Sequence, residues 1–221
     1  MGRVEAPLVK IALLGAESTG KSCLAEELAA HFRNEGRTVI VVHEVLREWC
    51  ERERRTPRPE EQLPIAQEQE RRVDEAAARA QIVIADTTAL MVAIYSAMLF
   101  EDGSLYQFAL ARQRSYEHTL LTGLDLPWIA DGLQRDGPHV REPVDALIRS
   151  VLSRNGIDYR VVYGSGPERL RNALMALNAS ASKPGDEGSC ASTQREAWTW
   201  ICDKCGDPDC EHRLFRSLVQ R

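Results

Sequence analysis

The sequence predicts an α/β fold with a mostly parallel five-stranded sheet covered by helices on both faces. Short β-branched runs alternate with longer amphipathic stretches across residues 8–179, which is the pattern of repeated strand–helix–strand units. The apolar fraction of 43% can bury a real core, and 221 residues fit one domain with a small appendage. We therefore expect one domain over residues 8–179.

The elements of the first half follow one another closely. Residues 9–14 are an apolar run, interrupted by Lys10 and ended by Gly15, as in a buried strand. Residues 21–32 carry apolar side chains on one helical face, and residues 38–42 form a second strand. A charge-rich helical stretch follows over 44–55. Pro57, Pro59 and Pro64 are expected to interrupt the helical pattern before it resumes over 67–80.

The second half continues the alternation. Residues 82–85 form a third strand ending at Asp86, and helices are expected over 88–99 and 105–116. A candidate fourth strand at 118–121, a helix ending near Gly156, a fifth strand at 159–163 and a final helix complete the domain. Beyond residue 179 the composition shifts to Ser, Ala, Gly, Lys and Pro, which predicts a flexible linker over 180–194 and a small tail over 195–221.

Charge and hydropathy exclude several classes of protein. The formal net charge is −5, so broad binding to nucleic acid or to anionic membranes is not expected. No apolar run approaches the ~20 residues of a membrane helix, and the first residues lack the apolar core of a secretory signal. We expect a cytoplasmic protein with no membrane partner.

Residues 15–22, Gly-Ala-Glu-Ser-Thr-Gly-Lys-Ser, match the G-x-x-x-x-G-K-[ST] phosphate loop at every fixed position. The match lies between a predicted strand and a predicted helix, where backbone N–H groups converge on phosphate oxygens. Lys21 would meet the β- and γ-phosphates of ATP, and the Ser22 hydroxyl would ligate Mg²⁺. The alternative is a glycine turn with an exposed lysine. The residues expected to bind the nucleotide are Gly15, Glu17, Ser18, Thr19, Gly20, Lys21, Ser22 and Cys23.

A carboxylate, Asp86, closes the third predicted strand. The carboxyl end of a parallel strand lies on the ligand-binding edge of such a sheet, so Asp86 would hold Mg²⁺ directly or through water. The alternative is that Asp86 caps the following helix, a role that Thr87 or Thr88 would share. The phosphate loop opens at the same edge, which favours the metal.

With these residues in place, the sequence resembles the P-loop family typified by the ribosylnicotinamide kinase domain of NadR-type proteins, an AAA-like P-loop NTPase similar to nucleoside kinases. Beyond the phosphate loop, the resemblance rests on residues 44–48 (Glu-Val-Leu-Arg-Glu), 85–87 (Ala-Asp-Thr) and 128–135 (Trp-Ile-Ala-Asp-Gly-Leu-Gln-Arg). It implies phosphorylation of the 5′-hydroxyl of nicotinamide riboside by ATP with Mg²⁺. NadR-type proteins usually carry an adenylyltransferase domain before the kinase, and only eight residues precede the first strand here, so that second activity is not expected.

The resemblance implies roles for further side chains. Glu44, after the second strand, would accept the proton of a ribose-like hydroxyl, and Arg47 would pair with Glu44 or neutralise substrate phosphate. Arg135 would close over the transferring phosphoryl group as part of a lid. Lys21 and Asp86 complete the expected catalytic set, and Asp86 also belongs to the substrate site. The alternatives are that 44–55 is a solvated charged face and that Arg135 is an exposed loop residue.

The tail carries the spacing C-x₂-C-x₄-C-x-H in Cys202, Cys205, Cys210 and His212. Three thiolates and an imidazole form a tetrahedral zinc set, and Cys190 is an alternative fourth ligand. A tail without metal, and other metal chemistry such as an iron–sulfur cluster, remain open. Apolar residues around this set would dock on the main domain or on a protein partner.

Two hypotheses for function follow. The first is a cytosolic ATP-dependent kinase that phosphorylates a nucleoside-like small molecule, with little covalent chemistry required of the protein. The second is a nucleotide-dependent regulatory ATPase whose tail contacts a partner.

Overall fold

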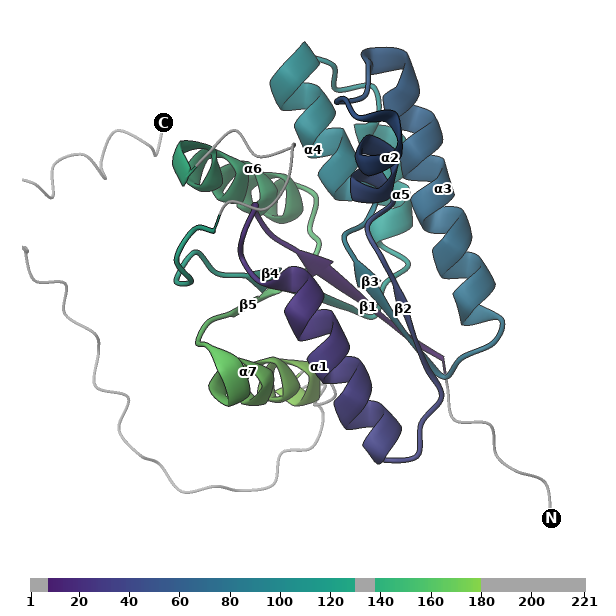
Figure 1. Cartoon of the computed structure of the whole chain (residues 1–221), viewed down its shortest axis with the longest axis vertical. Helices are drawn as coiled ribbons and strands as arrows, with labels where there is room; N and C mark the ends of the chain where they lie inside the picture. The colour runs from purple at the N-terminus through teal and green to yellow at the C-terminus, as the bar shows by residue number, and fades with distance from the viewer. Residues whose placement is uncertain (1–7, 130–137, 180–221) are drawn as a thin grey trace, which may run out of the picture. The chain divides into compact units, whose positions relative to one another are not determined.

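A computed structural model describes residues 8–129 and 138–179, and Figure 1 shows how the elements are arranged. Within these residues, five strands form one sheet in the order β2-β3-β1-β4-β5, and every neighbouring pair is parallel. The strands are β1 (Val9–Leu14), β2 (Val39–Val42), β3 (Ile82–Asp86), β4 (His118–Thr122) and β5 (Arg160–Val162). The predicted α/β fold with its five-stranded parallel sheet is confirmed.

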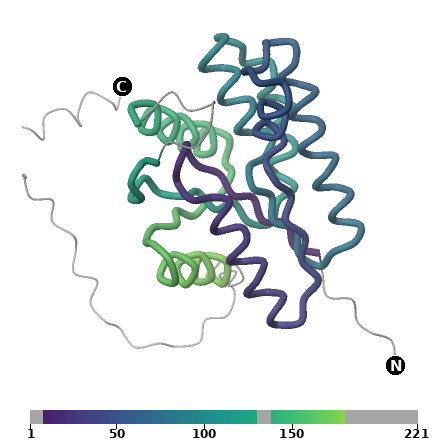
Figure 2. Tube along the Cα trace, in the orientation of Figure 1, coloured from purple at the N-terminus to yellow at the C-terminus, as the bar shows by residue number. Residues whose placement is uncertain are grey.

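Strand β1 lies in the middle of the sheet, between β3 and β4, and its path can be followed in Figure 2. Its side chains alternate between the two faces because successive residues of a strand point in opposite directions. Ile11 and Leu13 belong to one apolar cluster, whereas Leu14 belongs to a cluster on the opposite face. A strand buried on both faces reads as a continuous apolar run, which is why residues 9–14 were recognisable.

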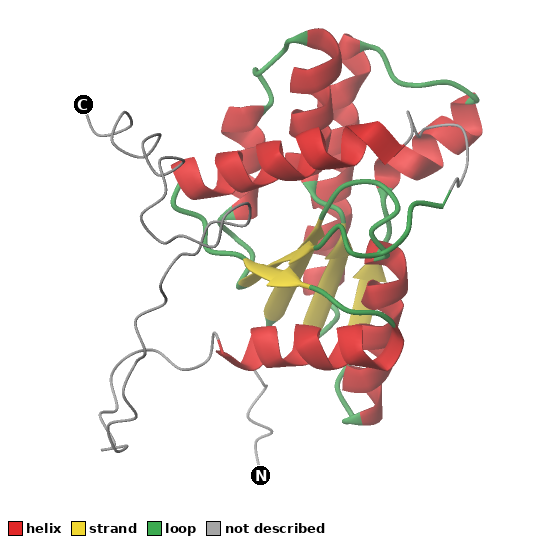
Figure 3. Ribbon diagram, turned by 90° about the vertical axis from the view of Figure 1, so that its left-hand side faces the viewer, coloured by secondary structure: helices red, strands yellow, loops and turns green. Residues whose placement is uncertain are grey.

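Helices cover both faces of the sheet, as Figure 3 shows. Helices α1 (Lys21–Asn34) and α7 (Gly166–Ala179) share one apolar cluster and lie side by side. The clusters on the other face draw on α2 (Val45–Glu53), α3 (Pro59–Ala77), α4 (Ala89–Phe100), α5 (Tyr106–Gln113) and α6 (Arg141–Arg154). A short 3₁₀ turn, η1 (Pro138–Val140), precedes α6. In the described part of the chain, no helix is long and apolar enough to cross a membrane.

Helix α3 differs from the sequence prediction, because it begins at Pro59 and continues through Pro64. Proline is tolerated at the first helical position, while Pro64 removes one intrahelical hydrogen bond. The helix start is held by Glu61, whose carboxylate accepts from the Arg58 amide at 2.7 Å and from both terminal nitrogens of Arg55 at 2.7 Å. The predicted interruption is present between Glu53 and Pro59, where α2 ends and α3 begins, whereas the expected break at Pro64 was wrong because α3 continues through it.

Candidate functional site

The strand register brings the sequence motifs to one edge of the sheet. Leu13 of β1 is level with Asp86 of β3, and Ala85 of β3 is level with Val42 of β2. The phosphate loop leaves β1 just after Leu13, and Glu44 follows β2 just after Val42. The loop, Asp86 and Glu44 therefore meet at the carboxyl ends of three neighbouring parallel strands, which is where ligands bind in open α/β sheets.

The two glycines of the phosphate loop are required by its backbone. Gly15 has φ +152°, and a Cβ at this position would lie 2.0 Å from the Thr122 hydroxyl oxygen. Gly20 has φ +74°, caps the start of α1 and touches Leu126, whose Cδ1 would lie 2.9 Å from an added Cβ. Ser18 also has positive φ, at 54°. Alternating left-handed residues turn successive N–H groups to one side, which forms an anion-binding concavity.

Two buried hydroxyl groups, those of Thr19 and Thr122, join the phosphate loop to the end of β4. The Thr19 hydroxyl donates to the Ala16 carbonyl at 2.8 Å and accepts from the Thr122 hydroxyl at 2.7 Å. Both threonines are fully buried. Since buried hydroxyl groups are costly to leave unpaired, these bonds hold the loop against the end of β4.

Lys21 is buried rather than exposed, with 9% of its surface accessible. Its ammonium donates to the carbonyl oxygens of Gly15 at 2.9 Å and Ala16 at 2.8 Å. The loop therefore holds the charge of Lys21 beside its own backbone, where it can meet a bound phosphate. This placement does not fit the alternative of a glycine turn with a solvent-exposed lysine.

The segment after β4 lies against the phosphate loop. The Ile129 amide donates to the Ser18 hydroxyl at 2.8 Å, and Leu126 contacts Gly20. Arg141, at the start of α6, donates to the Leu124 carbonyl at 3.4 Å. The first two contacts place Leu126 and Ile129 next to the loop, in line with the resemblance that puts residues 128–135 near the transferring phosphate, whereas the packing of Leu126 on Gly20 was not predicted.

Asp86 is only 2% exposed, and its Oδ1 has no hydrogen-bond partner in the described part of the chain. The capping role that the sequence left open belongs to Thr88, whose hydroxyl accepts from the Leu90 amide at 3.2 Å at the start of α4. A buried carboxylate oxygen without a partner is costly unless a cation or donor meets it. Its position at the loop edge and its oxygen chemistry fit Mg²⁺, with the half-buried Ser22 as a second oxygen ligand.

Next to Asp86, Thr87 has φ +79°, a conformation that is rare for a β-branched residue. Its amide donates to the Leu13 carbonyl at 3.1 Å, and its buried hydroxyl oxygen has no hydrogen-bond partner among residues 8–129 and 138–179. Backbone strain of this kind persists only where the surrounding structure enforces it. Here it places the turn that leads from β3 into α4.

Glu44 and Arg47 lie together at the start of α2. Their closest side-chain atoms, Glu44 Oε2 and Arg47 Nη2, are 3.2 Å apart, and the Glu44 side chain is 14% exposed. The start of the helix is fixed by the buried Gln69 of α3, whose Oε1 accepts from the Val45 amide at 2.9 Å. Helix α2 thereby keeps Glu44 at the sheet edge, and the predicted pairing of Glu44 with Arg47 is present.

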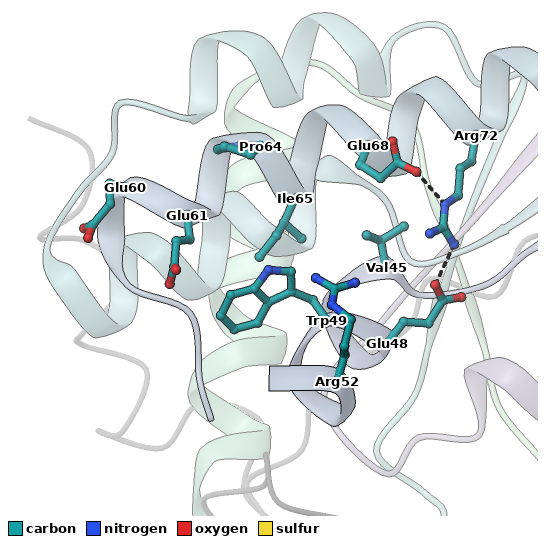
Figure 4. Close-up of a pocket in the computed structure, with 10 residues that line it drawn as sticks. All are labelled: Val45, Glu48, Trp49, Arg52, Glu60, Glu61, Pro64, Ile65, Glu68 and Arg72. Atoms are coloured by element: carbon teal, nitrogen blue, oxygen red, sulfur yellow. Dashed lines mark hydrogen bonds and ion pairs between the residues drawn. The ribbon is translucent and has the colours of Figure 1, made fainter. Parts of the chain in front are cut away.

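The outer side of α2 forms a groove of about 340 Å³ with α3. Figure 4 shows Trp49 in this groove, together with an ion-pair chain in which Arg72 joins Glu48 and Glu68 at 2.7 and 2.9 Å. Arg55 stacks on the Trp49 ring, with its guanidinium carbon 4.7 Å from the ring centroid. The groove is lined by Val45, Glu48, Trp49, Arg52, Glu60, Glu61, Pro64, Ile65, Glu68 and Arg72.

The remaining predicted residues lie in the phosphate loop, in α1 or outside the described part of the chain. Arg135 and the zinc ligands Cys202, Cys205, Cys210 and His212, with the alternative Cys190, lie outside the described residues. Glu17 is half-buried in the phosphate loop, and Cys23 is exposed in the first turn of α1. Among residues 8–129 and 138–179, no three His, Cys, Asp or Glu side chains gather closely enough to hold a metal ion by themselves.

The parallel sheet, the phosphate loop after β1 and the carboxylate after β3 define a P-loop NTPase. Sequence comparison is more specific: the family described as AAA domain matches residues 10–169, and the chain belongs to that family. No curated protein sequence matches the chain.

Solved structures share the fold. NadR protein in complex with NR superposes with a TM-score of 0.65 at 17% identity, covering 82% of this chain and 53% of that one. NadR in complex with NAD and AMP-PNP superposes with a TM-score of 0.61 at 18% identity, covering 81% of this chain and 51% of the NadR chain. Thymidylate kinase from Ehrlichia chaffeensis superposes with a TM-score of 0.57 at 13% identity, covering 78% of this chain and 98% of the kinase. The chain thus spans about half the length of the NadR chains and nearly the whole thymidylate kinase, so its fold is that of nucleoside and nucleotide kinases.

Proposed function

We propose that this protein is an ATP- and Mg²⁺-dependent phosphotransferase that phosphorylates a hydroxyl group of a small nucleoside-like acceptor. One observation carries the proposal: a structured phosphate loop, a buried Asp86 oxygen that no described residue hydrogen-bonds and the Glu44–Arg47 pair meet at a single sheet edge. Phosphoryl transfer needs these parts, because positioning and charge neutralisation provide most of its catalysis.

Each group has a role in this scheme. The N–H groups of residues 15–22 and the Lys21 ammonium bind the phosphates of ATP. Ser22 and Asp86 hold Mg²⁺, which when bound offsets negative charge on the β- and γ-phosphate oxygens. Glu44 takes the proton of the acceptor hydroxyl, whose oxygen bonds to the γ-phosphorus as the bond from that phosphorus to the bridging oxygen breaks. The products are ADP and a phosphate ester, and the proton resides on Glu44.

The arginines complete the charge balance. Arg47 orients Glu44 through their ion pair and lies within one helical turn of it, where it can contact the acceptor. We assign Arg135 to a lid that closes over the transferring group, as the resemblance implies. The similar structures named NadR with NR and thymidylate kinase support a nucleoside-like acceptor, and nicotinamide riboside is the first to test.

The test is a panel of nucleosides incubated with ATP and Mg²⁺ and analysed by mass spectrometry. One member of the panel is expected to gain a phosphate. Glu44→Gln is expected to lower kcat by about 10²-fold or more, as for a general base, while nucleotide affinity stays near that of the wild type. Glu51→Gln is the matched control, since Glu51 is an exposed residue of the same helix. ATP hydrolysis without any phosphorylated nucleoside would instead support the regulatory ATPase.

For the tail, we propose a structural zinc site formed by Cys202, Cys205, Cys210 and His212, with Cys190 as the alternative to His212. The spacing and the ligand types support it. Metal analysis of the full chain before and after Cys205→Ser is the test. One zinc per chain, lost in the variant, is expected, and the absence of stoichiometric zinc in the wild type would refute the site.

A further inference from the structure

Arg169 is a buried arginine that contacts the backbone of the phosphate loop at Thr19. It lies in the first turn of α7, and its side chain is 4% exposed. One terminal nitrogen, Nη2, donates to the Thr19 carbonyl at 2.6 Å. The other, Nη1, donates to the Gly164 carbonyl at 2.8 Å and lies 3.4 Å from Asp125 Oδ1. A single guanidinium therefore joins the phosphate loop to the segments that follow β4 and β5.

Asp125 fixes this arrangement. Its Oδ2 accepts from the Gly164 amide at 2.6 Å, while its Oδ1 faces Arg169. The carboxylate thus balances the buried positive charge and at the same time positions the carbonyl that the arginine binds. A buried guanidinium requires such partners because desolvation of an isolated charge is costly.

The contact with Thr19 bears directly on phosphate binding. A trans peptide unit directs its C=O and N–H to opposite sides. The Thr19 carbonyl is held toward α7, so the Gly20 N–H of the same peptide unit points away from α7. The left-handed conformations of Ser18 and Gly20 turn neighbouring amides toward a shared concavity, which is the arrangement of an anion-binding nest.

We propose that Arg169 is a positioning residue for the nucleotide phosphates: by holding the Thr19 carbonyl, it aims the Gly20 N–H into the phosphate cradle. The inference rests on the proposed function in that the bound anion is a nucleotide triphosphate. Arginine suits the task because its two terminal nitrogens reach two carbonyls at once. A lysine ammonium can donate to two adjacent carbonyls, as that of Lys21 does, but it lacks the two separated nitrogens of a planar guanidinium and cannot reproduce this fork.

The competing explanation is a purely structural link between α7 and the loops. The two explanations differ in what they change. If Arg169 is only a structural link, its replacement lowers the melting temperature and leaves the affinity of the folded protein for phosphates intact. If Arg169 is a positioning residue, its replacement weakens that affinity, both for a nucleotide and for phosphates without a base.

The experiment measures the affinity of the full chain for AMP-PNP and for inorganic tripolyphosphate, each with Mg²⁺, by calorimetry. Arg169→Lys is compared with the wild type and with Arg171→Lys, an exposed arginine of the same helix. Arg169→Lys is expected to weaken both ligands by a similar factor of about 10 or more, the usual effect of losing one charge-assisted hydrogen bond. Arg171→Lys is expected to bind both as the wild type does.

Other outcomes would overturn this proposal or the proposed function. Unchanged affinity of folded Arg169→Lys for both ligands, or weaker binding of AMP-PNP alone, overturns the proposal. If Arg169→Lys does not fold, Asp125→Asn replaces it, because it weakens the support of the arginine without removing the guanidinium, and a loss for both ligands is again expected. Unchanged affinity of that variant overturns the proposal too. If the wild type binds neither ligand, it is the proposed function that fails.

Discussion

The ammonium of Lys21 donates to the carbonyl oxygen of Gly15 at 2.9 Å, so the first and seventh residues of the phosphate loop contact each other directly. The chain reverses between them, and the lysine returns to the point at which the loop leaves β1. A cation held in this way needs little reorganisation when a phosphate arrives, which is how preorganised charges lower a barrier.

Replacement of Lys21 by methionine keeps most of the apolar side chain and removes the charge. We expect Lys21→Met to lower kcat for phosphoryl transfer by about 10³-fold, comparable with other groups that stabilise charge in the transition state. Steady-state kinetics with the acceptor that the nucleoside panel identifies measure this loss. Lys10→Met is the control, since Lys10 binds Ser115 at 2.9 Å and lies on β1 away from the loop. Equal loss in both variants would contradict a specific role for Lys21.

Asp86→Asn removes the charge of a buried carboxylate whose Oδ1 has no hydrogen-bond partner in the part of the chain that the structure describes. We expect the Mg²⁺ concentration for half-maximal activity to rise by about 10-fold, because a neutral amide is a weaker ligand for this hard cation. We also expect the melting temperature of the metal-free protein to stay level or increase, since an uncompensated buried charge is removed. Asp158→Asn, at an exposed position, is the control. An unchanged Mg²⁺ dependence would rule out Asp86 as a metal-binding group.

Gly15→Ala places a methyl group 2.0 Å from the Thr122 hydroxyl oxygen. Overpacking of this kind is expected to lower the free energy of unfolding by about 1–3 kcal/mol. Thr122→Ala in the same chain removes the overlapping oxygen and is expected to recover part of that loss, as a double-mutant cycle in urea would show. Gly36→Ala is the control for backbone strain alone, because Gly36 has φ +80° and, within the described residues, a Cβ added there would meet no atom beyond its chain neighbours within 4 Å. If the changes in the free energy of unfolding caused by the two substitutions simply add, the predicted contact is contradicted.

The start of α3 is expected to depend on pH. The hydrogen bonds from Arg55, and next those from the Arg58 amide, lower the pKa of Glu61 from 4.5 to about 2. A depressed pKa means that the contribution of Glu61 to stability is fully present above pH 4.5 and is lost as the pH falls toward 2. Glu61→Gln should therefore shift the urea midpoint at pH 7, and the shift should shrink between pH 4.5 and 2. Glu60→Gln, at the neighbouring exposed position, controls for general charge effects. A shift that does not vary with pH would refute this account.

The α/β class and the five strands could be predicted from the sequence because local patterns encode them. A strand buried on both faces, such as 9–14, needs a continuous apolar run, and the phosphate loop needs Gly15 and Gly20 where the backbone approaches its neighbours. Strand ends were predicted less accurately, as in β5, which is shorter than its apolar run. The placement of Asp86 and Glu44 at one edge followed from the parallel sheet itself.

Tertiary structure alone decided the contacts that support the loop. Thr122 meets Thr19 across 103 residues, and Arg169 meets the Thr19 carbonyl across 150. Local periodicity predicts neither contact, because a single polar side chain on a buried strand or helix has the same sequence context whatever it binds. Helix α3 begins at Pro59 and runs through Pro64, and the Arg55–Glu61 contact that holds its start comes from a residue outside the helix. Local sequence therefore determined the elements and the phosphate-binding motif, whereas the packing of distant segments decided how that motif is held.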